Sequence, residues 1–273
     1  MSAPVVKGWC PGPRRPMPSG DGLVVRARAP LGELTPGAAR GLAGLAQAHA
    51  SGAVELTNRG NLQLRGVSEA AFPALAQGLA ALGLAGAEGE AEARVSVVLD
   101  PFRGLGDADA QTLCADTLAH ALAAPEFSAL PVKFGFVVDA GARRRLDGVS
   151  GDVRVEGADG AFVVRADGLA TGRRAADAAG AAALALDLAR WFLASGGVGA
   201  DGRGRMRAHV AAGATPPPEL FGDARPSPAA ARPRPGPGAR GSMSRRRSAS
   251  LPPPPCVASP TPPRRRCGSR PSA

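Results

Sequence analysis

A tight turn between two short apolar segments constrains the fold of this chain more than any other local feature. Residues 54–57 and 62–65 have the composition of short strands. They are joined by Asn58, Arg59, Gly60 and Asn61, residue types that tolerate turn geometry. The segment therefore predicts a tightly paired hairpin.

Strand and helix signals flank this hairpin on both sides. They predict a strand at 22–29, a helix at 36–49 and a second helix at 69–82. Thr35 followed by Pro36 is a typical helix start, an N-cap followed by proline at the first helical position. Ser68 is expected to cap the second helix, which Pro73 interrupts or bends. The order strand, helix, strand, strand, helix is most of a split βαβ unit of the ferredoxin-like type.

A second α+β layer follows a polar linker at residues 87–92. Its expected strands are 94–99, 133–139, 152–156 and 161–165, and its expected helices are 107–123 and 173–193. We place the two units at residues 7–86 and 93–210, and expect an α+β fold class. With 273 residues, 44% of them hydrophobic, the chain is long and apolar enough to bury such cores.

The net charge of +10 is concentrated at the carboxyl end. Residues 223–273 hold eleven arginines and one acid, which leaves 22 basic and 22 acidic residues in the remainder. Proline runs and few large apolar side chains predict a disordered tail over 215–273, because such a segment cannot offset its chain entropy by burial. A nucleic-acid-binding arm is the functional alternative, and we rank it last.

Neither the cysteines nor the histidines have the spacing of a metal site. The cysteines are Cys10, Cys114, Cys256 and Cys267, and the histidines are His49, His120 and His209. We expect Cys114 to be a small buried residue and His209 to lie in a loop, with the histidines packed or solvated. Charged residues interrupt the most apolar stretch, 175–194, so we expect a cytoplasmic protein without a membrane span.

Three segments resemble signature blocks of the nitrite/sulfite reductase family, in the usual order. They are RARAPLG at 26–32, ELTNRGNLQLRG at 55–66 and LPVKF at 130–134, which are similar to R-x-R-x-P-G-G, L-T-N/T-R-Q-x-x-Q-x-x-G and L-P-R-K-F. The opening Cys10-Pro11-Gly12 and residues 17–22 and 135–141 resemble the precorrin-3B synthase branch. The resemblance covers residues 7–193 and implies a ferredoxin-like half-domain followed by a tetrapyrrole-site α+β domain.

The resemblance implies two groups of site residues. Arg28, Arg94 and Lys133 would line a basic pocket for the reacting anion, as the catalytic group. The tetrapyrrole-supporting group comprises Thr57, Asn58, Arg59 and Gln63, and we add Arg65 as a further cation at a strand end. A tetrapyrrole's carboxylates are costly to bury without cations opposite them, and arginine provides a planar fork of donors. The alternative is that each arginine is a solvated strand end paired with a nearby acid.

For the precorrin-3B synthase branch the implied reaction is oxygen-dependent hydroxylation and lactone formation on precorrin-3A, in cobalamin biosynthesis. Reduced nicotinamide supplies electrons, and the implied cofactors are a [4Fe-4S] cluster and siroheme or non-heme iron. The cluster pattern C-x5-C with C-x3-C is absent from this sequence. We therefore expect an amino-terminal half that is inactive alone, with a separately encoded second half or a homodimer as partner.

Two further hypotheses remain open at this point. A fragment of a siroheme-dependent sulfite or nitrite reductase is disfavoured because Gly135 stands where those enzymes carry a second lysine. A non-catalytic tetrapyrrole-binding module would keep the basic pocket without the cluster.

Overall fold

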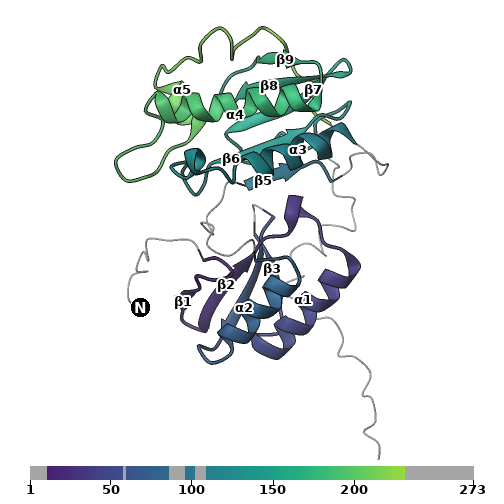
Figure 1. Ribbon diagram of the computed structural model, residues 1–273, viewed down its shortest axis with the longest axis vertical. Coiled ribbons are helices and arrows are strands. Elements are labelled where there is room, and N and C mark those ends of the chain that lie inside the picture. Colours follow the sequence, from purple (N-terminus) through teal and green to yellow (C-terminus); the bar gives the residue numbers. More distant parts are fainter. Residues whose placement is uncertain (1–10, 58–59, 86–95, 102–108, 231–273) are drawn as a thin grey trace, which may run out of the picture.

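The computed structural model describes residues 11–57, 60–85, 96–101 and 109–230, which form two α+β units (Figure 1). The purple and blue unit holds the sheet β1-β2-β4-β3, and the teal and green unit holds the sheet β5-β6-β7-β8-β9. The α+β class and the ferredoxin-like first unit expected from the sequence are therefore confirmed.

The first sheet is antiparallel throughout. Its strands are β1 (Met17–Ser19), β2 (Gly22–Ala27), β3 (Val54–Leu56) and β4 (Leu62–Val67). The predicted hairpin pairs β3 with β4, and β4 then pairs with β2. On the far side of β2, the backbone N–H of Arg28 donates to the carbonyl of Leu84 at 3.3 Å. The chain after the second helix thus returns to the edge of the sheet, as the split βαβ arrangement requires.

Two helices cover one face of this sheet. They are α1 (Pro36–His49) and α2 (Phe72–Ala81). Leu42, Leu75 and Leu79 pack against Val25 and Leu64 of the strands, and all five are buried. Because strand side chains alternate between faces, the residues between these apolar positions point to the opposite side of the sheet.

The two helix starts differ in how well the sequence predicts them. Thr35 caps α1 as expected, because its Oγ1 accepts from the Ala38 N–H at 3.1 Å. The predicted start of the second helix at Ser68 is wrong: the Ser68 hydroxyl closes a turn by accepting from Ala71, and α2 begins at Phe72. Pro73 lies in the first turn of α2, where its missing N–H costs nothing, and it neither interrupts nor bends the helix.

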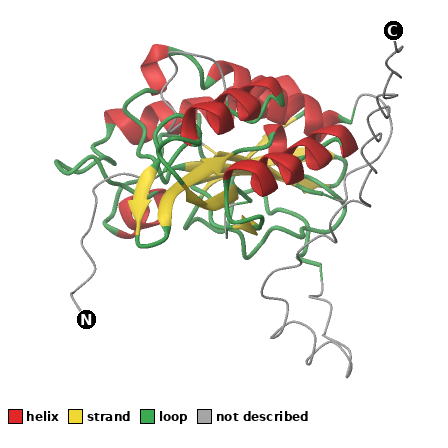
Figure 2. Cartoon of the chain, turned by 90° about the horizontal axis from the view of Figure 1, so that it is seen from below, coloured by secondary structure: helices red, strands yellow, loops and turns green. Residues whose placement is uncertain are grey.

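The second sheet is mixed. Its strands are β5 (Ser96–Leu99), β6 (Gly135–Asp139), β7 (Val153–Ala158), β8 (Ala161–Ala166) and β9 (Arg173–Ala175). The pairs β5-β6 and β6-β7 are parallel, whereas β7-β8 and β8-β9 are antiparallel. Helices α3 (Ala110–Ala121) and α4 (Ala178–Ala194) pack on one face, around Phe134, Phe136 and Phe192. In Figure 2 most helices lie on one side of the strands.

Two elements of this unit correct the sequence prediction. The helix predicted over 173–193 starts later, because Arg173–Ala175 form strand β9 and Asp177 caps α4 by accepting from Gly180 at 2.7 Å. His209 lies in the short helix α5 (Met206–Ala211) rather than in a loop.

The predicted disordered tail begins too early. Residues 215–230 belong to the second unit, where Ser227 donates its N–H to Gly157 at 2.6 Å and Ala230 donates to Arg144 at 2.6 Å. Bridges at Gly172–Ala224 and Arg144–Ala229 fix both ends of the segment 224–230. The rest of the tail, 231–273, and the linker at 87–92 lie outside the described residues. No helix in the part of the chain that the structure describes is long and apolar enough to cross a membrane.

We expect a chain that ends at residue 222 to be less stable than one that ends at residue 230, by about 1–4 kcal/mol. The shorter chain loses the hydrogen bonds from Ser227 to Gly157 and from Ala230 to Arg144, and the one from Arg144 Nε to the Ser227 carbonyl. Urea unfolding followed through Trp191 fluorescence measures the difference. Equal unfolding midpoints would show that segment 224–230 contributes nothing.

Candidate functional site

The face of the first sheet opposite its helices carries a row of polar side chains. Arg26 on β2, Gln63 on β4 and Glu55 on β3 lie in register with one another. The Arg26 Nη2 donates to Gln63 Oε1 at 2.7 Å, and Gln63 Nε2 donates to Glu55 Oε2 at 2.7 Å. Gln63 is thereby held in one orientation, with its oxygen toward the arginine and its amide nitrogen toward the glutamate.

Arg28 lies at one end of this face, together with the hairpin turn. Its Nε donates to Asn61 Oδ1 at 3.3 Å. The Asn61 backbone is fixed in turn by Thr57, whose Oγ1 accepts from the Asn61 N–H at 3.1 Å. Arg28 and Thr57, assigned from the sequence to different groups, therefore share Asn61 as a common neighbour.

Arg26 has a buried donor without a partner. The Nε of Arg26 is out of contact with solvent and makes no hydrogen bond within the described part of the chain. Such a group is costly unless a ligand or another molecule satisfies it. The sequence placed Arg26 among the strand-end cations without selecting it as a site residue. The alternation of Arg26 and Arg28 along the strand indicates that both side chains lie on one face, but the sequence does not predict that the Arg26 Nε is buried.

Arg65 lies at the other end of the face, beside the β1–β2 turn. Its guanidinium binds Asp21 at 2.9 and 3.0 Å and Ser19 at 2.9 Å. The hydrogen bond from Arg65 lowers the pKa of Asp21 below its ordinary value. The structure thus gives Arg65 the task of holding this turn, and its tetrapyrrole contact stays a prediction.

The other site residues predicted from the sequence do not lie on this sheet face in the part of the chain that the structure describes. Lys133 is exposed in a turn that precedes β6, closed by the Phe134 N–H donating to Pro131 at 2.7 Å, and it is not in the strand predicted from 133. Arg94, Asn58 and Arg59 lie outside the described residues. The structure therefore gathers Arg28, Thr57 and Gln63 on one sheet face, whereas Lys133 belongs to the second unit.

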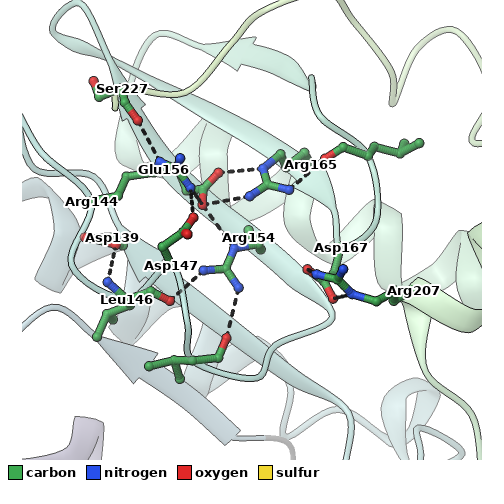
Figure 3. Close-up of polar contacts among 12 residues, drawn as sticks. Asp139, Arg144, Leu146, Asp147, Arg154, Glu156, Arg165, Asp167, Arg207 and Ser227 are labelled. Carbon is green, nitrogen blue, oxygen red and sulfur yellow. Dashed lines mark hydrogen bonds and ion pairs between the residues drawn. The ribbon is translucent and has the colours of Figure 1, made fainter. Parts of the chain in front are cut away.

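A second polar cluster lies inside the second unit, around Glu156 (Figure 3). The fully buried Glu156 accepts from Arg154 at 3.0 Å, from Arg165 at 2.6 and 3.0 Å and from Arg144 at 3.1 Å. Burial raises the pKa of Glu156, but the hydrogen bonds and charges of Arg165 and Arg154 outweigh it, so the pKa lies below its ordinary value. Both carboxylate oxygens are occupied by the protein's own cations.

Two further carboxylates lie at the ends of the neighbouring parallel strands. Asp100 follows β5 and binds Arg145 at 2.9 Å, and Asp139 ends β6 and accepts from the Leu146 N–H at 2.7 Å. Burial raises the pKa of Asp139. Within the described ranges, no group of three or more histidine, cysteine or acidic side chains could hold a metal ion. We interpret these carboxylates as anchors for loop 141–147.

Cys114 and His209 are both engaged in packing. Cys114 is buried on α3, and burial raises its pKa to about 12, which makes its thiolate hard to form. His209 Nε2 lies 2.7 Å from the Ser195 hydroxyl, and the ring contacts Trp191 and Phe192. Neither side chain has the surroundings of a cofactor ligand.

In a comparison with protein-family models, residues 15–82 match the nitrite/sulfite reductase ferredoxin-like half domain. Over these residues the chain is similar to that family. The half-domain spans β1 to α2 and therefore contains the whole polar face, including Arg26, Arg28, Thr57, Gln63 and Arg65. The resemblance inferred from the sequence is confirmed.

The chain is also similar to a curated protein and to a solved structure. A precorrin-3B synthase from Sinorhizobium sp is 36% identical over 154 residues, which are 55% of this chain and 32% of that protein. The chain thus spans about a third of the length of this curated relative. The NirA protein of Mycobacterium tuberculosis is similar in structure over 52% of this chain and 27% of that one, at 19% identity and a TM-score of 0.40.

Replacing Glu156 by glutamine should destabilise the second unit by about 3–5 kcal/mol at neutral pH, because the buried Arg154 and the partly buried Arg165 and Arg144 lose the carboxylate to which all three donate. The folded pKa of Glu156 lies below the unfolded one, so its contribution is present above about pH 4.5 and is lost as the pH falls through the folded pKa. The gap between wild type and Glu156→Gln should therefore narrow in acid, as measured by urea unfolding at pH 7 and pH 4.

Asp159→Asn is the matched control. Asp159 is 93% exposed, pairs with Arg174 at 3.1 Å and has a φ of 47°, which asparagine tolerates. Its stability change should stay within about 0.5 kcal/mol at either pH. A Glu156→Gln protein as stable as this control would refute the role of Glu156 as the buried anchor.

Proposed function

We propose that the polar face of the half-domain binds carboxylates of a tetrapyrrole, in an oxidoreductase related to precorrin-3B synthase. The observation that carries this proposal is the Nε of Arg26, which is buried without a hydrogen-bond partner in the described part of the chain and lies two residues before Arg28. A guanidinium presents paired N–H groups that match a carboxylate, and charge-assisted contacts of this kind give both affinity and orientation. A tetrapyrrole carries several carboxylates, so it can use more than one such contact.

Each residue of this polar face would have its own role in binding the tetrapyrrole. Arg26 and Arg28 would hold carboxylates, while Gln63 and Asn61 orient the two guanidinium groups through the hydrogen bonds at 2.7 and 3.3 Å. Thr57 would keep the hairpin turn in place through Asn61. Lys133, with Arg94, is proposed to complete the anion pocket from the second unit.

The reaction proposed is that of the relative. The similarity to precorrin-3B synthase supports an oxidoreductase role. The finer proposal is hydroxylation of precorrin-3A with lactone formation, in which one atom of dioxygen enters the substrate and the other leaves as water. Reduced nicotinamide would supply the two electrons. A tetrapyrrole cofactor or iron centre, when bound, supplies the redox chemistry, and the protein supplies binding and orientation.

The two implied cofactor types fit the described residues unequally. The arginines and amides of the half-domain suit a tetrapyrrole's carboxylates. An iron-sulfur cluster needs several thiolates at one place, and Cys114, buried with a pKa of about 12, does not suit that task. The chain covers 32% of its relative, so we propose that a separately encoded segment or a second copy of this chain completes the enzyme, in the cytoplasm.

A sulfite or nitrite reductase is the weaker candidate. In those enzymes a second lysine would occupy the position of Gly135, and glycine has no side-chain ammonium group to offer there. A non-catalytic tetrapyrrole-binding module would use the same face, and it is distinguished by binding without substrate oxidation.

Titration of the purified chain with siroheme under anaerobic conditions tests the binding proposal directly. The absorption bands of the tetrapyrrole should shift on binding, and Arg28→Gln should weaken the affinity by roughly tenfold to a hundredfold, since one charge-assisted contact is lost. Arg190→Gln is the control, because Arg190 pairs with Glu126 and Asp187 on the second unit. No spectral change with wild type, or equal affinities for both variants, would refute the proposal.

Arg26→Lys separates charge from geometry at the same face. Lysine keeps the positive charge but loses the planar fork and the Nε donor, so the affinity for siroheme should fall by roughly tenfold although the net charge is unchanged. The same anaerobic titration measures it. Unchanged affinity would mean that only the charge of residue 26 matters, and that its buried Nε is not part of the site.

A further inference from the structure

The segment between β2 and α1 faces the cores of both units. Ala29 and Leu34 pack into the core of the first unit. Leu31, between them in sequence, instead packs against the core of the second unit. Two leucines three residues apart on one short segment thus contact different hydrophobic cores.

The backbone at Leu31 explains this change of direction. Leu31 has φ 50° and ψ 17°, in the left-handed region, and Gly32 follows with φ 79°. The turn is closed by the Gly32 N–H donating to Ala29 and the Glu33 N–H donating to Pro30, both at 3.0 Å. Glycine or asparagine suits such a position, whereas leucine is strained there. Strain of this kind persists only where surrounding contacts compensate for it.

The contact that compensates lies on the edge of the second sheet. The short 3-10 turn η1 (Pro30–Gly32) packs against β5, the strand at the end of the order β5-β6-β7-β8-β9. In Figure 1 the dark purple segment between β2 and α1 lies at the boundary between the two units. The apolar side chain of Leu31 therefore gains burial that its own unit does not provide.

The geometry points to Leu31 as a positioning residue that docks the half-domain on the edge of the second sheet. Arg28 lies three residues before Leu31 and is tied to its own unit through Asn61 and Leu84. A fixed contact at Leu31 therefore also fixes Arg28 relative to the unit that carries Lys133. The consequence for ligand affinity rests on the proposed function, whereas the docking itself does not.

Residual dipolar couplings of the full-length protein test the docking without any ligand. Weakly aligned wild type should give one alignment tensor for both units, because they move as one body. Leu31→Asn keeps a residue that tolerates the left-handed turn but removes the apolar contact, and should give two different tensors with unchanged secondary shifts in each unit. Leu31→Met, which restores an apolar side chain, should return to one tensor.

Leu113→Asn is the matched control, since Leu113 is 57% exposed on α3 and should keep one tensor. One shared tensor in Leu31→Asn would overturn the inference. Siroheme titration then tests the consequence for binding. If only about a tenth of the Leu31→Asn molecules keep the two units in the docked orientation, the affinity for siroheme falls roughly tenfold. Failure of wild type to bind siroheme would refute the proposed function, while the tensors would still decide the role of Leu31.

Discussion

The second unit depends on the neutralisation of one buried carboxylate. Glu156 is enclosed on β7, where an unpaired charge would be prohibitively costly, and Arg144, Arg154 and Arg165 all donate to it. Arg144 then extends the effect beyond the sheet, because its Nε also donates to Ser227 at 2.6 Å and its backbone pairs with Pro228 and Ala230. Arg144 thus links the neutralisation of Glu156 to segment 224–230, while Asp100 and Asp139 hold the following part of loop 141–147 through Arg145 and Leu146.

The two polar regions differ in the kind of atom that is left without a partner. Carboxyl ends of parallel strands are frequent ligand sites, and there Asp100 binds Arg145 and Asp139 accepts from the Leu146 N–H, while Asp139 Oδ1 is buried without a hydrogen-bond partner in the described structure. On the polar face of the half-domain the unpartnered buried atom is a donor, the Nε of Arg26. The carboxylates of a tetrapyrrole are acceptors, so the face that offers a donor suits them better.

Local signals in the sequence predict the local elements well. The Thr35-Pro36 start of α1 and the hairpin of β3 and β4 follow from capping and turn chemistry within a few residues. Two failures involve long-range pairing: Arg173–Ala175 becomes a strand by pairing with β8, and residues 224–230 are ordered by Arg144 and Gly157. Others are local, since Ser68 closes a turn ahead of α2 and His209 lies in the short helix α5. At the site, motif resemblance could find Arg28, Thr57 and Gln63. The unpartnered Nε of Arg26 required knowledge of burial, which no spacing rule provides.

The strained turn at Leu31 connects the two units of the molecule. A half-domain with one helix-covered face and one polar face has no internal reason to hold a leucine in left-handed geometry. The contact that compensates for the backbone strain at Leu31 is the packing of its side chain against the core of the second unit. The strained turn is therefore stable only while the two units stay packed together. The basic residues of the two units would then share one fixed geometry, and a carboxylate-rich ligand would meet a preorganised surface instead of paying to order it.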